Sequence, residues 1–95
     1  MGYFVNLFII LNQMKNNYSS NHKILVSLLR AIRLEAGFSQ ADLAKNLKQP
    51  QSFVSKYETG ERRLDLLEVK RICNACGVSL GEFVQKLESA LNVAE

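Results

Sequence analysis

The segment SQADLAKNLKQPQSFVSKYETG, residues 39–60, decides the fold of this chain. Apolar residues recur there at helical spacing on both sides of a short break at residues 48–50. The first run places Leu43, Ala44 and Leu47 on one face. The second run does the same with Phe53, Val54 and Tyr57. Each run is shorter than about three turns and would not form a stable helix alone in water. We therefore expect a larger domain to hold both helices.

Length and charge limit what that domain can be. The chain has 95 residues, enough for one core, and its 47% hydrophobic and 22% charged residues are typical of a globular protein. Residues 1–64 contain nine Lys or Arg against four Asp or Glu, whereas residues 65–95 contain three against five. This asymmetry favours a polyanion-binding face on one side. An uneven spread of charge over an ordinary surface fits the same counts.

The cysteines and the histidine indicate no chemistry of their own. Cys73 and Cys76 have no second ligand pair, and His22 is distant in sequence, so a four-ligand metal site is not expected. Both cysteines fall where a helix needs small apolar residues, which favours core filling in a reduced, cytoplasmic protein. The chain has no paired acid and base, and His22 lies in a linker-like stretch. We therefore expect neither an enzyme nor a cofactor.

Residues 1–21 form an apolar extension followed by a polar linker. The run YFVNLFIIL, residues 3–11, has no preceding positive charge, unlike a signal peptide, and it is too short to cross a membrane. Three interpretations remain open. In the first, Met14 is the physiological start or the extension is non-essential. In the second, the run pairs as a strand in an oligomer, and in the third it anchors weakly to a membrane surface. The lack of nearby basic residues disfavours the last.

From His22 onward the pattern predicts five helices and no strand, and hence an all-α domain over residues 22–90 with a tail at 91–95. The first helix ends near Gly37. Ser39 caps a second helix over residues 40–47, and Pro50 opens a third that ends near Glu58. Asp65 and Ser79 cap the last two. Their expected apolar positions are Leu66, Leu67, Val69, Ile72, Cys73 and Cys76 in the fourth helix, and Leu80, Phe83, Val84, Leu87 and Leu91 in the fifth.

Two helices joined by such a short turn are typical of the helix-turn-helix, whose second helix enters the DNA major groove. Here Val54 and Tyr57 would attach that helix to the domain. The side chains left on its outer face are Gln51, Ser52, Ser55 and Lys56. Amide, hydroxyl and ammonium groups are suited to base edges. The same polar face also fits a solvated helix of an ordinary bundle.

The order of motifs in residues 23–88 resembles the Xre/Cro-type helix-turn-helix family of phage repressors and bacterial regulators. The matching stretches are LLRAIRLEAGFSQADLAKNL, PQSFVSKYETGERRLD and LLEVKRICNACGVSLGEFV. The resemblance implies a lambda-repressor-like DNA-binding domain. It also implies that Gln51, Ser52 and Lys56, with Ser55 beside them, contact bases.

Other roles follow from the same resemblance. It assigns phosphate contacts to Gln40, at the start of the second helix, and to the loop residues Thr59, Arg62 and Arg63. It implies a structural ion pair between Arg33 and Glu58. One position departs from the pattern, because Lys48 stands where most members have glycine. If the turn keeps a positive φ there, a side chain costs roughly 1–2 kcal/mol.

These features favour a sequence-specific transcriptional regulator that binds a palindromic operator in double-stranded DNA as a homodimer. The alternative is an antitoxin-type module that neutralises a protein partner and binds DNA secondarily, with residues 3–11 as its partner segment. For the homodimer we expect the contact around Phe83 to Val93, where the apolar stripe of the last helix continues through Leu91 and Val93. Residues 3–11 are the competing surface.

Overall fold

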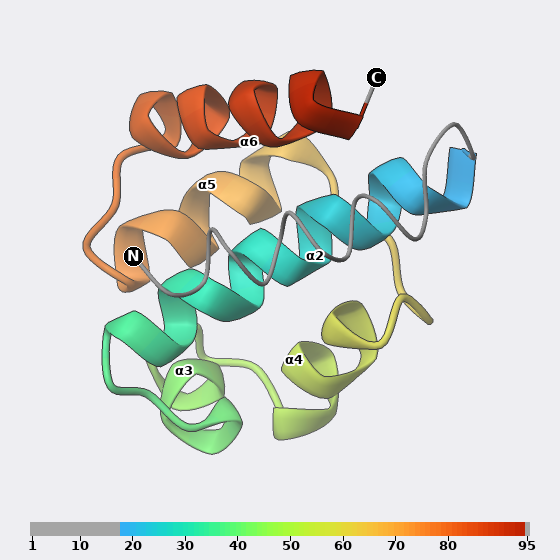
Figure 1. The fold of residues 1–95 in the computed structure, drawn as a ribbon. Coiled ribbons are helices and arrows are strands. Elements are labelled where there is room, and N and C mark those ends of the chain that lie inside the picture. The colour runs from blue at the N-terminus through green and yellow to red at the C-terminus, as the bar shows by residue number, and fades with distance from the viewer. Residues whose placement is uncertain (1–17, 95) are drawn as a thin grey trace.

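The computed structural model describes residues 18–94, and this part of the chain folds into five α-helices without a strand (Figure 1). The helices are α2 (Tyr18–Glu35), α3 (Gln40–Asn46), α4 (Gln51–Glu58), α5 (Leu66–Ala75) and α6 (Leu80–Ala94). The all-α prediction is confirmed. The three predicted helix N-caps are also confirmed. The side chains of Ser39, Asp65 and Ser79 each accept a hydrogen bond from the backbone N–H three residues later.

The first helix starts earlier than the apolar periodicity indicates. It begins at Tyr18, so residues 18–21 and His22 are helical and do not belong to a linker. Tyr18 to Asn21 are polar or amphipathic, and an apolar stripe cannot mark that part of a helix. The apolar run at residues 3–11 and Met14 lie outside the described residues.

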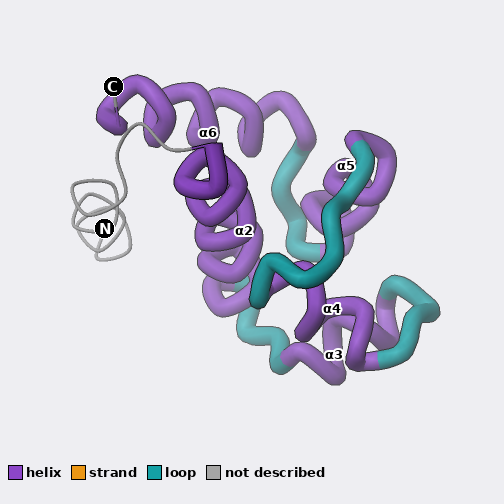
Figure 2. Tube along the Cα trace, turned by 90° about the vertical axis from the view of Figure 1, so that its right-hand side faces the viewer, coloured by secondary structure: helices purple, strands orange, loops and turns teal. Residues whose placement is uncertain are grey.

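Helix α2 is the centre of the molecule. It packs against α4, α5 and α6, and the two views place α3 and α4 on one side of it and α6 on the other (Figures 1 and 2). The largest fully buried side chains come from all five helices: Tyr57, Phe83, Ile24, Leu28, Leu29, Leu43, Ile72, Val54 and Cys73. Burying an aliphatic or aromatic side chain of this size contributes about 1.5–3 kcal/mol. This shared core supports α3 and α4, which are too short to be stable alone.

Several predicted core positions differ in the structure. Leu66 and Leu67 are 64% and 70% exposed, because they occupy the first turn of α5 and the core is filled further along by Val69, Ile72 and Cys73. In α6, Leu80, Val84, Leu87 and Leu91 are only partly buried, while Phe83 and the unpredicted Ala90 are buried. Ala90 was missed because a small side chain adds little to an apolar pattern.

The cysteines pack as expected. Cys73 is fully buried, Cys76 lies against the core, and neither forms a disulfide. Burial raises the pKa of the Cys73 thiol to about 11 and also raises that of Cys76, so both remain protonated and apolar near neutral pH. Between residues 18 and 94, no group of three His, Cys, Asp or Glu side chains is placed to hold a metal. No helix in this range is long and apolar enough to cross a membrane.

Candidate nucleic-acid interface

Helix α3 ends and α4 begins within the short turn that joins them. Leu47 is the last residue with helical geometry, and Lys48 follows with φ 55°. The Lys48 N–H donates to the Lys45 carbonyl at 3.1 Å, and the Gln49 N–H donates to the Ala44 carbonyl at 2.9 Å. This pair of bonds is the Schellman arrangement, which needs a left-handed residue where Lys48 stands. Pro50 then precedes α4 as its N-cap residue, one position before the expected first turn.

Helix α4 has one attached face and one open face. Val54 and Tyr57 are completely buried, as predicted. Gln51, Ser52 and Lys56 are exposed, and Ser55 is half-buried with its Oγ donating to the Ser52 carbonyl at 3.3 Å. Positions spaced by one, four and five residues share one side of a helix. The structure therefore brings all four proposed base-contacting residues together on the open side of α4.

Glu58 joins three helices at the end of α4. Arg33, from α2, donates through Nε and Nη2 to the two oxygens of Glu58 at 2.7 and 3.0 Å, and it also donates to the Phe38 carbonyl at 2.8 Å. The side chains of this pair are only 6% and 4% exposed. Gln40, from α3, donates to the same carboxylate at 3.0 Å. The hydrogen bond to Glu58 raises the pKa of Arg33. This bonding fixes α3 and α4 relative to α2.

The loop after α4 carries the remaining proposed phosphate contacts. Thr59 Oγ1 donates to the Lys56 carbonyl at 3.1 Å, and Arg63 is exposed. Arg62 is placed differently. Its guanidinium makes a bidentate ion pair with Glu68 of α5, with distances of 3.1 and 2.8 Å. Its Cζ lies 4.7 Å from the centroid of the Phe53 ring. Of these three residues, Arg62 is thus the one turned towards the body of the protein.

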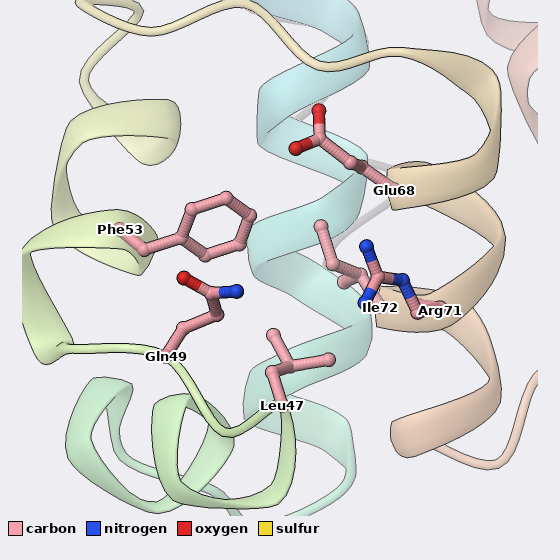
Figure 3. Close-up of a pocket in the computed structure, with 6 residues that line it drawn as sticks. All are labelled: Leu47, Gln49, Phe53, Glu68, Arg71 and Ile72. Atoms are coloured by element: carbon pink, nitrogen blue, oxygen red, sulfur yellow. The ribbon is translucent and has the colours of Figure 1, made fainter.

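Two hollows border this surface. The smaller lies between the turn, α4 and α5, has a volume of about 20 Å³ and is lined by Leu47, Gln49, Phe53, Glu68, Arg71 and Ile72 (Figure 3). It has room for about one water molecule. The larger, about 440 Å³, is an open depression between α2 and the loop after α4. Its polar lining residues include Lys23, Ser27, Thr59 and Arg63.

That depression adds residues that the sequence did not indicate. Lys23 and His22 lie across it from Arg63, although they are 40 and 41 positions before it in the chain. The Nε2 atom of His22 is buried and accepts or donates no hydrogen bond among the described residues. Burial, followed by the charge of Arg63, lowers the pKa of His22. Only the packing of α2 against α4 brings these groups together, so no local motif predicts them.

Comparison with known proteins places this geometry in a family. Residues 29–83 match the model of a helix-turn-helix family, and this match includes α3, α4 and α5 in full. A solved structure, described as an XRE-family like protein from Pseudomonas syringae pv. tomato str. DC3000, is 40% identical in sequence. The similarity covers 76% of this chain and 88% of that one, with a TM-score of 0.71. No curated protein matches the chain.

Proposed function

The chain belongs to the Xre-type helix-turn-helix family of DNA-binding regulators, and on this premise we propose that it regulates transcription by binding a palindromic operator as a homodimer. In this proposal α4 enters the major groove, where an α-helix fits. The protein would act in the cytoplasm, where bacterial regulators meet their DNA.

One observation carries the proposal: α4 buries a single side and leaves the other to four polar side chains. Gln51 and Ser52 lie at the helix start, and Ser55 and Lys56 lie one turn later. Glutamine can bond adenine through paired donor and acceptor groups, and lysine can donate to guanine O6 and N7. A helix packed by one stripe through Val54 and Tyr57 can place these groups against base edges without unfolding anything else.

Phosphate contacts would flank this helix on both sides. We assign them to Gln40, the first residue of α3, and to Thr59 and Arg63 in the loop after α4. Gln40 keeps one amide N–H for a phosphate while its other donates to Glu58. Such contacts set the position of the protein on the duplex, whereas base contacts set the sequence preference.

The experiment compares the base preference of the wild type with that of Gln51→Ala across all single-base variants of a bound fragment. Loss of a base contact should cost about 1–3 kcal/mol at one base pair and remove the preference there. Asn74→Ala, which removes an exposed amide on α5, is the control and should leave the profile unchanged. An equal loss of affinity for every sequence would exclude Gln51 from base recognition.

A second observation would favour the antitoxin alternative. In that case this chain would co-purify with a partner protein and would itself show no preference among DNA sequences.

A further inference from the structure

The guanidinium of Arg62 is held by groups from three parts of the protein. It pairs with both oxygens of Glu68 in α5, it donates to the Arg63 carbonyl at 3.0 Å, and it covers the Phe53 ring of α4. Its backbone N–H donates to the Lys56 carbonyl at 3.1 Å. Arg62 therefore attaches the loop between α4 and α5 to both of these helices.

Glu68 is suited to hold this arginine. Its carboxylate also accepts the Asp65 backbone N–H at 2.9 Å, so the α5 N-terminal cap fixes its position. The Glu68 side chain is 17% exposed, against 41% for Arg62. An exposed ion pair usually contributes little to stability, but bidentate geometry with a fixed partner is the exception. Moving Arg62 onto a DNA phosphate would break this pair and leave Glu68 uncompensated close to the phosphate.

We propose that Arg62 is a positioning residue, which Glu68 and Phe53 hold so that the loop presents Thr59 and Arg63 to the DNA backbone, and that it makes no phosphate contact itself. This inference rests on the proposed function, since it assigns a role within the DNA-binding surface. It replaces the phosphate contact that the family resemblance gives to Arg62.

Substitution of Glu68 separates the two roles, because they predict opposite effects on DNA affinity. If Arg62 contacts phosphate, Glu68→Gln releases it, removes a nearby negative charge and strengthens binding. If Arg62 positions the loop, Glu68→Gln weakens binding about two- to fivefold, the range for losing a well-formed exposed pair. Glutamine can still accept the Asp65 N–H, so the cap of α5 is kept. Glu61 is an exposed carboxylate in the same loop that accepts a bond from the Thr59 hydroxyl at 3.5 Å. Glu61→Gln keeps an acceptor for that hydroxyl, so it controls for the loss of a negative charge and should strengthen binding.

Salt dependence gives a second readout that loss of stability alone would not change. The slope of log K against log salt is negative, and each lost phosphate contact reduces its magnitude by about 0.9. We expect Arg62→Met to weaken DNA binding with an unchanged salt slope. Arg63→Met should reduce the magnitude of that slope. Lys70→Met, at an exposed position of α5, is the control for loss of one positive charge. The double variant Arg62→Met with Glu68→Gln should bind no worse than the weaker single variant, because both remove one interaction.

Stronger DNA binding by Glu68→Gln, or a smaller salt dependence of DNA binding for Arg62→Met, would overturn the inference. Hydrogen exchange in the free protein tests loop order independently of DNA. Both Arg62→Met and Glu68→Gln should speed exchange of the Arg62 amide, which is bonded to the Lys56 carbonyl. Unchanged exchange in both variants would contradict a positioning role. A wild-type protein that binds no DNA would instead refute the proposed function, and the exchange result would still decide whether Arg62 orders the loop.

Discussion

The backbone angle of Lys48 determines how α3 stops and α4 starts. Its φ of 55° lies in the left-handed region, and the same region is occupied by glycine after α2, α4 and α5. The sequence indicated the site of this strain, since most members of the family have glycine there. The hydrogen bonds of the Schellman arrangement and the packed helices on either side keep Lys48 in this conformation.

Replacing Lys48 with glycine should therefore stabilise the protein. Relief of the left-handed strain is worth roughly 1–2 kcal/mol, and the greater freedom of glycine in the unfolded chain takes back part of it, which leaves a net gain of about 0.5–1 kcal/mol. Urea unfolding measures this difference. Lys45→Gly, at an exposed position inside α3, is the control and should lose about 1 kcal/mol. Destabilisation by Lys48→Gly would mean that the lysine side chain contributes more than its backbone costs.

At the scale of helices, local signals at the ends were more informative than apolar patterns in the middle. Ser39, Asp65 and Ser79 were identified as caps from their residue type and position, and each forms reciprocal bonds with an acid three residues later. The exposure of Leu66 and Leu67 depends on where α5 meets the core, which no pattern within α5 records. The Arg62–Glu68 pair likewise depends on the path of the loop.

These caps make stability depend on pH in the acid range. Hydrogen bonds from the backbone N–H of Ser39 and of Ser79 lower the pKa of Asp42 and Glu82, respectively. A carboxylate with a lowered folded-state pKa stabilises the protein above its unfolded pKa, and that contribution disappears as pH falls through the folded-state value. We expect the free energy of unfolding to fall from about pH 4.5 downward.

In Glu82→Gln the free energy of unfolding should fall less steeply as the pH is lowered, because glutamine can keep the cap without titrating. Urea unfolding between about pH 2.5 and pH 6 measures the slope. Glu88→Gln, an exposed residue of the same helix, removes the same charge outside the cap. If both variants change the slope equally, general charge explains the acid sensitivity and the cap does not.

For the whole molecule, α2 separates two surfaces. Helices α3 and α4 lie on one side of α2, and α6 lies on the other (Figures 1 and 2). The sequence predicted that α6 has apolar residues left over, and in the structure Leu91 packs against the core while Val93 stays 52% exposed. Leu67 of α5 is more exposed than either. A dimer contact thus has candidates on α5 and α6.

We keep the prediction that residues 83–93 supply the homodimer contact. Val93→Glu should then lower the association constant measured by sedimentation, because a charge would be buried at the interface. A chain starting at Met14 and the variant Leu67→Glu should dimerise like the wild type. Dissociation caused only by the truncation would instead place the contact in the N-terminal extension. Dissociation caused only by Leu67→Glu would place it on α5.

Selection of bound fragments from random double-stranded DNA by the wild-type protein tests the central claim most directly. A homodimer that places one α4 helix in each of two major-groove segments should enrich an inverted repeat. Its half-site centres should lie about 34 Å apart, or a multiple of that distance, as two-fold docking requires. Enriched fragments that share no motif, or equal affinity for selected and unselected DNA, would contradict the claim that α4 reads sequence.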